Sequence, residues 1–144
     1  PLPDLSVFPP EIIEFESPPG TYVDAFPVHL MTPATLRTLA ALLGDDRTVD
    51  IRRFRPNVVV DVADTDEPWP EQHWVGRTLR VGDAVLEVVA PCPRCVMVTR
   101  PVAELQGDRD VLRAVVSRAD QNLGVYATVA GPGTVSVGDP VVIG

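Results

Sequence analysis

The sequence predicts a mainly β fold, a closed β-barrel accompanied by a few short flanking helices. Segments with strand-like patterns outnumber those with helical periodicity, and a Val-Gly-Asp-x-Val turn occurs twice, at residues 81–85 and 137–141, as in β-hairpins. With 144 residues, of which 45% are hydrophobic, the chain is large enough for one core. The expected strands are residues 57–62, 77–81, 84–90, 96–99, 123–129, 134–137 and 140–143.

The beginning of the chain is typical of a connector that leads into a domain. Residues 1–20 are rich in proline, and only the short apolar stretch at residues 12–15 could form an edge strand. We therefore expect a linker-like segment at 1–20 and a single domain at 21–144. Residues 22–31 are expected to be extended, with Pro27 at an edge or a bulge.

Two segments carry the pattern of amphipathic helices. Thr32 is a suitable N-cap, Pro33 suits the first helical position, and leucines and alanines follow at helical spacing until Gly44 supplies the stop. The second helix is predicted at residues 109–119, with Asp108 as its cap.

The charge of the chain excludes several classes of partner. Twelve arginines, no lysine and twenty acidic residues give a formal net charge of −8, which disfavours nucleic acid and anionic membranes, although a local arginine patch can bind one anion. The acidic segment 61–73 is predicted to be a solvated surface loop. The chain start lacks the pattern of a signal peptide, and no apolar run reaches the roughly 18–20 residues of a membrane span. Together with only two cysteines, this predicts a soluble, cytoplasmic protein.

The pair Cys92-Pro-Arg-Cys95 is the sharpest chemical feature. A zinc site needs two further ligands, and the only histidines, His29 and His73, lack the paired spacing of such sites. A thioredoxin-like pair is disfavoured because the residues after Cys95 have a strand pattern. Two readings stay open: two buried structural cysteines, or a reactive thiolate favoured by Arg94 on a proline-stiffened bend.

A second cluster joins three arginines and an asparagine in residues 52–57. Arginine forks bind phosphate or carboxylate, and an asparagine can pair with a heterocycle edge. Alternatively, one or two of the arginines pair with nearby aspartates in a structural network. A third candidate is Asp24, which precedes the helix whose first turn, with Thr32, could receive an anion.

Taken together, these motifs resemble those of the MOSC domain family, named after the C-terminal domain of molybdenum cofactor sulfurase. The resemblance covers residues 22–143 in order and is closest to the branch with the mitochondrial amidoxime-reducing component and its bacterial relatives. The matching strings are Asp24-Ala-Phe-Pro27, Arg53-Phe-Arg55-Pro-Asn57-Val-Val-Val, Trp74-x-Gly76-x-x-Leu79-x-x-Gly82, Pro91-Cys-x-Arg94-Cys95, Asn122-Leu-Gly124-Val-Tyr126 and Gly133-x-Val135-x-x-Gly138-Asp139-x-Val141.

The resemblance implies a molybdenum-cofactor (molybdopterin) site. It implies that Cys95 ligates the metal and that Asp24 faces the metal and its bound water, so these two are the expected catalytic residues. The residues expected around the pterin and its phosphate are Arg53, Arg55, Asn57, Arg94 and Thr32. These assignments agree with the chemistry of a soft thiolate ligand and of arginines beside an anion.

The implied activity is that of a molybdenum-dependent oxidoreductase that reduces N-hydroxylated or N-oxide compounds, with an external protein as electron donor. Two-domain members of the family carry a β-rich N-terminal domain, which we expect to be absent from these 144 residues. The alternative is a non-catalytic module that holds the cofactor or carries sulfur as a persulfide on Cys95, served by a pyridoxal-phosphate cysteine desulfurase.

Overall fold

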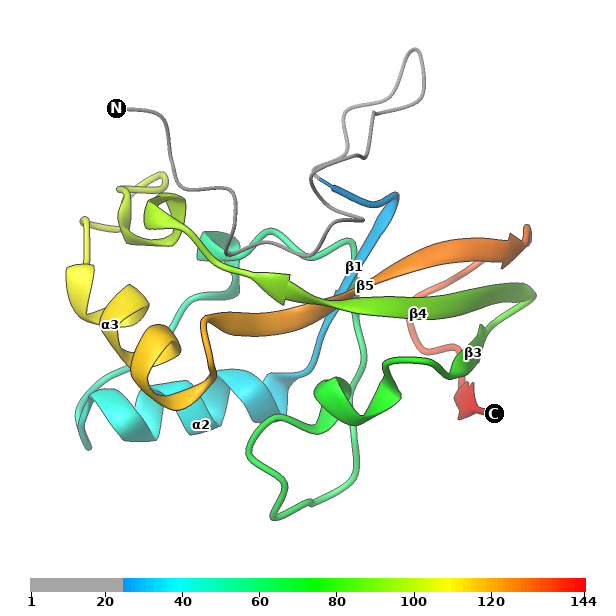
Figure 1. The fold of residues 1–144 in the computed structure, drawn as a ribbon, viewed down its shortest axis with the longest axis horizontal. Coiled ribbons are helices and arrows are strands. Elements are labelled where there is room, and N and C mark those ends of the chain that lie inside the picture. Colours follow the sequence, from blue (N-terminus) through cyan, green and yellow to red (C-terminus); the bar gives the residue numbers. More distant parts are fainter. Residues whose placement is uncertain (1–24) are drawn as a thin grey trace.

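A computed structural model describes residues 25–144, in which a single six-stranded sheet dominates (Figure 1). The strand order is β2-β1-β5-β4-β3-β6, and all neighbours are antiparallel except the parallel pair β1 and β2. The strands are β1 (Val28–Met31), β2 (Val58–Val59), β3 (Thr78–Val81), β4 (Ala84–Pro93), β5 (Asn122–Gly131) and β6 (Val141–Ile143).

The long pair β4 and β5 gives the sheet its curl. Their register shifts between Val85 and Leu86, again between Val88 and Ala90, and again near Pro93. Such bulges increase the local twist and bend a sheet toward a barrel. One core cluster packs largely from residues of this sheet and consists of Leu30, Val60, Trp74, Leu79, Val81, Leu86, Val88, Val125 and Ala127.

The prediction of a mainly β fold with flanking helices is confirmed, but the expected closure of the barrel is wrong. The sheet is a curled half-barrel, because no ladder joins its edge strands β2 and β6 within the part of the chain that the structure describes. The expected strand at 57–62 shrinks to two residues, and residues 134–137 form no strand. Consequently the second Val-Gly-Asp-x-Val turn leads into β6 without a preceding strand, whereas the first joins β3 and β4 as predicted.

Two helices cover one end of the sheet, on the left in Figure 1. They are α2 (Pro33–Leu43) and α3 (Arg109–Arg118), which begin at the predicted caps Thr32 and Asp108. None of the helices within residues 25–144 is long and apolar enough to cross a bilayer. The second core cluster fills the space between helices and sheet and consists of Met31, Leu39, Phe54, Val98, Val111, Val115 and Leu123.

Three short 3-10 helices complete the fold: η2 (Ile51–Arg53), η3 (Pro70–Trp74) and η4 (Val96–Thr99). The prediction of a strand at residues 96–99 is wrong. The segment follows Pro93 and turns back on itself, and the Thr99 hydroxyl donates to the Val96 carbonyl over 2.6 Å. The run Val-Met-Val-Thr, which has a strand pattern in the sequence, therefore forms a tight turn in the structure.

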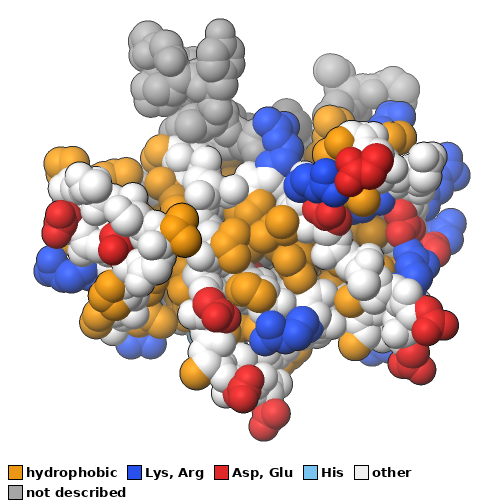
Figure 2. Space-filling view, turned by 180° about the vertical axis from the view of Figure 1, so that it is seen from behind, with side chains coloured by type: hydrophobic (Ala, Val, Ile, Leu, Met, Phe, Trp, Pro, Cys, Tyr) orange, Lys and Arg blue, Asp and Glu red, His pale blue; other side chains and the backbone are white. Residues whose placement is uncertain are grey.

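The acidic loop is solvated only in its first part. Residues 61–68 are largely exposed, as predicted, but Glu71 in η3 is fully buried. Its Oε2 accepts hydrogen bonds from the hydroxyls of Thr32 (2.9 Å) and Thr35 (2.6 Å) at the start of α2. Figure 2 shows basic side chains mainly on the half of the molecule that carries α3, with acidic side chains among them.

Candidate functional site

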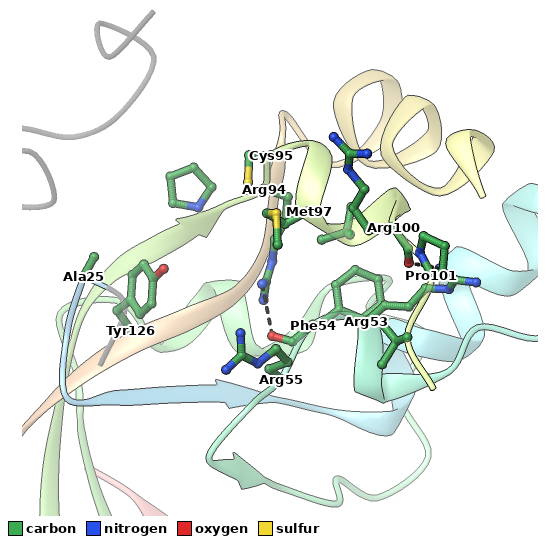
Figure 3. Close-up of a pocket in the computed structure, with 13 residues that line it drawn as sticks. Ala25, Arg53, Phe54, Arg55, Arg94, Cys95, Met97, Arg100, Pro101 and Tyr126 are labelled. Atoms are coloured by element: carbon green, nitrogen blue, oxygen red, sulfur yellow. Dashed lines mark hydrogen bonds between the residues drawn. The ribbon is translucent and has the colours of Figure 1, made fainter. Parts of the chain in front are cut away.

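A cleft of about 630 Å³ opens where the end of β4 meets η2 and η4 (Figure 3). We call it the thiol cleft. Its walls come from segments far apart in the sequence: the segment after η2 on one side and the end of β4 with η4 on the other. The lining residues that matter below are Arg53, Phe54, Arg55, Arg94, Cys95 and Tyr126.

The two cysteines differ in exposure. Cys92 is 1% exposed and packs in a small core cluster with Ala25 and Tyr126. Cys95 is exposed, lines the cleft and stands at the N-cap of η4, where its thiol makes no capping hydrogen bond. The proline-bounded end of β4 therefore presents one thiol to the cleft and buries the other.

Arg94, next to the exposed thiol of Cys95, is buried and held in place by several hydrogen bonds. It is 7% exposed and donates from Nε to the Leu123 carbonyl (2.8 Å) and from Nη1 to the Phe54 carbonyl (3.2 Å; Figure 3). From Nη2 it donates to His29 Nε2 (2.5 Å) and to Met31 Sδ (3.8 Å). A guanidinium has five N–H groups, so at most one remains for a ligand. Arg94 thus joins the two walls of the cleft.

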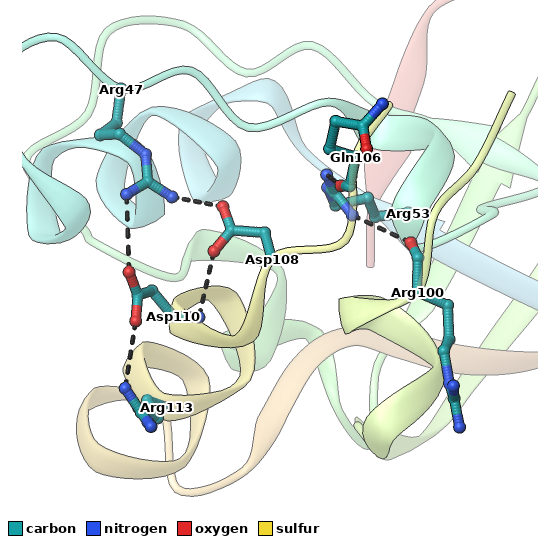
Figure 4. Close-up of polar contacts among 7 residues, drawn as sticks. All are labelled: Arg47, Arg53, Arg100, Gln106, Asp108, Asp110 and Arg113. Atoms are coloured by element: carbon teal, nitrogen blue, oxygen red, sulfur yellow. Dashed lines mark hydrogen bonds and ion pairs between the residues drawn. The ribbon is translucent and has the colours of Figure 1, made fainter. Parts of the chain in front are cut away.

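Arg53 braces the same cleft from its other side (Figure 4). Its guanidinium donates to the backbone carbonyls of Arg100 (3.1 Å) and Gln106 (2.5 Å), which ties the loop after η4 to η2. Figure 4 also shows Arg47 paired with Asp108, the N-cap of α3. The arginines on this side of the molecule therefore hold several loops together.

Arg55 is a lining arginine whose guanidinium is free to meet a ligand. Within the described residues its guanidinium has no hydrogen bond or ion pair, its side chain is exposed, and its backbone is left-handed with φ 54°. Left-handed backbone at a residue other than glycine is strained and concentrates at functional sites. By contrast, Arg52 pairs with Asp50 (2.9 Å) and Glu104 (2.7 Å), so the predicted structural network accounts for this one arginine.

Two other predicted site residues within the described part of the chain do not line the cleft. Asn57 lies just beyond it, and its Oδ1 accepts the backbone N–H of His29 over 2.7 Å. Thr32 is fully buried, caps α2 and donates to Glu71, so the structure gives it a structural role. Asp24 lies outside the described residues.

His29 is a site residue that sequence reasoning missed. It is 4% exposed in β1, and burial together with the adjacent Arg94 charge lowers its pKa from 6.5 to about 3. The ring is therefore neutral and accepts from Arg94. The only sequence signal is a histidine in an otherwise apolar strand, which is common for structural reasons.

The donor set of the cleft suits one kind of metal centre. Among the described residues there is no group of three or more His, Cys, Asp or Glu side chains that could hold an ion. The cleft offers one exposed thiol and two guanidinium groups, those of Arg55 and Arg100, that have no hydrogen bond or ion pair within the described residues. These residues fit a metal that arrives with ligands of its own on an anionic organic cofactor, because thiolate is a soft ligand and guanidinium binds phosphate.

A β-rich domain with a single exposed thiol beside arginines thus defines a class of small binding domain. A comparison with family models then identifies the group: the chain belongs to the MOSC domain family, whose model matches residues 18–142.

Relatives of known name agree with this assignment. The chain is 31% identical over 135 residues to mitochondrial amidoxime reducing component 2 of Rattus norvegicus, covering 83% of this chain and 37% of that protein. It is 29% identical over 135 residues to mitochondrial amidoxime-reducing component 1 of Homo sapiens, with 83% and 37% covered. A shorter match, 38% identical over 69 residues, is to molybdenum cofactor sulfurase of Drosophila mojavensis, with 48% and 8% covered. The chain thus spans less than two fifths of these relatives.

Solved structures support the fold alone. YiiM from Escherichia coli superposes with a TM-score of 0.55 at 17% identity, over 81% of this chain and 53% of that chain. YiiM from Geobacillus stearothermophilus superposes with the same TM-score at 14% identity and the same coverage.

Proposed function

We propose that the thiol cleft binds a molybdenum–pterin cofactor and that the domain takes part in the reduction of N-hydroxylated compounds. The observation that carries the proposal is the single exposed thiol of Cys95 in a cleft with the unpaired guanidinium of Arg55. The name of the amidoxime reducing relative supports the proposed reaction, and the name of the molybdenum cofactor sulfurase relative supports the proposed cofactor.

In this proposal the lining residues divide into ligands and supports. Cys95 supplies the thiolate to the metal, and Arg55 binds the pterin phosphate. Arg53 and Arg94 keep the walls in place, since their guanidinium groups are already bonded to backbone carbonyls and to His29. The roles of Asn57 and Asp24 remain predictions of the sequence.

Such a cofactor, held by Cys95 and Arg55, would supply two-electron redox chemistry, so that an N-hydroxyl group, two electrons and two protons would give the reduced N–H compound and water. This chain's residues bind and orient that group, and the aromatic rings of Phe54 and Tyr126 also line the cleft. The electrons require a separate donor protein, which we propose as the partner. A cytoplasmic location stays a prediction.

The activity is tested with protein produced in a host that makes the cofactor. Loaded protein receives a reduced artificial donor and an N-hydroxylated amidine, and the amidine product is quantified. The proposal predicts product formation that is lost in Cys95→Ala and retained in Cys92→Ala. The test is repeated with loaded protein joined to the additional sequence that the longer relatives carry. If this protein is inactive on a panel of N-hydroxylated substrates, the proposed reaction is contradicted.

A second candidate function is sulfur transfer, which the exposure of Cys95 and the match to molybdenum cofactor sulfurase favour. Incubation with a cysteine desulfurase and cysteine then adds one sulfur to Cys95, seen by intact mass and by thiocyanate release with cyanide. Absence of this adduct in Cys95→Ala but not in Cys92→Ala supports the carrier function. No adduct on wild-type protein contradicts it.

A further inference from the structure

His29 connects the two walls of the thiol cleft through both its backbone and its ring. Its backbone N–H donates to Asn57 Oδ1 (2.7 Å), and its carbonyl accepts from the Asn57 N–H (2.9 Å). Its ring accepts at Nε2 from Arg94 Nη2 (2.5 Å), beside Cys95 on the opposite wall. One strand residue therefore contacts both segments that form the cleft.

The charge and tautomer of this ring follow from its surroundings. Arg94, the charged group in contact with the ring, can only donate, so Nε2 must be unprotonated. Burial and the Arg94 charge hold the pKa of His29 at about 3, which keeps the ring neutral. A neutral imidazole carries its single proton on the other nitrogen, here Nδ1. The backbone groups of Arg55 and Leu123 act on this pKa in the opposite direction, but burial and the Arg94 charge outweigh them.

Residues of β5 pack closely against the imidazole ring of His29. Gly124 in β5 has φ 81°, and a Cβ there would lie 2.3 Å from His29 Nε2, so only glycine lets β5 come this close. The ring of Tyr126, also from β5, lies with its centroid 5.8 Å from that of His29. The backbone at Gly124 and the ring of Tyr126 therefore fit closely around the His29 side chain.

We propose that His29 is a positioning residue of the thiol cleft, which orients the Arg94 guanidinium and through it fixes Cys95 relative to Arg55 and Asn57. The inference deepens the proposed function, since it concerns the same cleft, but it is argued from the chain's own contacts. A variant that removes the Nε2 acceptor releases Arg94 and loosens the segment that carries Cys95, while the fold persists.

The first test measures the ring in metal-free wild-type protein. The chain contains two histidines, so long-range nitrogen–proton NMR of protein with labelled histidine gives two imidazole patterns, and His73→Gln assigns them. The Nδ1–H tautomer is expected for His29. An Nε2–H tautomer or a charged ring at neutral pH overturns the proposal, whatever the variants do.

The second test compares His29→Leu with the conservative His29→Gln, whose amide oxygen can replace Nε2 as acceptor. In His29→Leu we expect a shifted Nε–Hε signal of Arg94 and a rate of Cys95 alkylation that rises about fivefold, a factor that one lost hydrogen bond can produce. His29→Gln should restore both. His73→Leu is the matched control and should change neither.

Each outcome of these tests either supports or overturns the proposed role of His29. Unchanged Arg94 signals and alkylation in a folded His29→Leu protein overturn the proposal, as does a His29→Gln protein that behaves like His29→Leu. These measurements use metal-free protein. If the wild-type chain takes up no molybdenum, the proposed function is contradicted. The result on His29 is unaffected, because it does not depend on metal binding.

Discussion

Acidification should destabilise this protein through one buried side chain. His29 stays neutral in the folded state down to about pH 3, whereas its ordinary pKa is 6.5. Between these values the unfolded chain binds one proton more than the folded chain does. The free energy of unfolding must therefore fall as the pH falls through this window.

The size of the effect follows from the two pKa values. Each pH unit inside the window removes about 1.4 kcal/mol, so a change from about pH 7 to about pH 4.5 removes roughly 2–3 kcal/mol. His29 is 4% exposed, and little of this is screened by solvent. The exposed Asp50, whose pKa Arg52 lowers from 3.8 to about 2, contributes only at lower pH.

The assay is urea unfolding of the wild-type protein and of His29→Gln at both pH values. The wild type should lose roughly 2–3 kcal/mol more than the variant on acidification, because all other titrating groups are shared. Comparison of the two losses removes any constant effect of the substitution. Equal losses in the two proteins would show that His29 does not take up a proton on unfolding in this pH range.

Three further substitutions test separate parts of the structure. Gly124→Ala places a methyl group against the buried imidazole at a positive φ and should cost at least about 3 kcal/mol in urea unfolding, whereas Gly138→Ala, at a positive φ with open space, should cost about 1. Arg55→Ala should reduce molybdenum retained after dialysis about tenfold, and Arg52→Ala, an exposed neighbour of equal charge, should not; equal retention contradicts a role in anion binding. Glu71→Ala should cost about 3 kcal/mol, because two buried hydroxyls lose their acceptor and a void remains; a loss below about 1 would contradict this account.

Much of the architecture could be predicted because it depends on local signals. The caps Thr32 and Asp108 and the Gly82 turn are set by side chains close in sequence, and the structure confirms them. Closure of the barrel depends instead on whether distant edge strands meet, which local patterns do not encode. The strand predicted at residues 96–99 is wrong because the run Val-Met-Val-Thr, which indicated it, forms a 3-10 turn after Pro93.

The site was predictable in composition and less so in the roles of its members. The motifs brought Cys95, Arg53, Arg55 and Arg94 together, and all four line one cleft. Sequence spacing does not reveal which guanidinium is already satisfied by carbonyls far along the chain, so Arg94 and Arg55 looked equivalent. The sequence around His29 does not reveal its contacts, because its partners become neighbours only when β1, β4 and β5 pair.

The proposed binding of a molybdenum cofactor depends most directly on Cys95 as the metal ligand. The decisive measurement is the molybdenum content per chain of wild-type protein, Cys95→Ala and Cys92→Ala, all purified from the same cofactor-producing host. We expect about one molybdenum per chain in the wild type and in Cys92→Ala, and almost none in Cys95→Ala. Equal molybdenum content in the two cysteine variants would show that Cys95 is not the metal ligand.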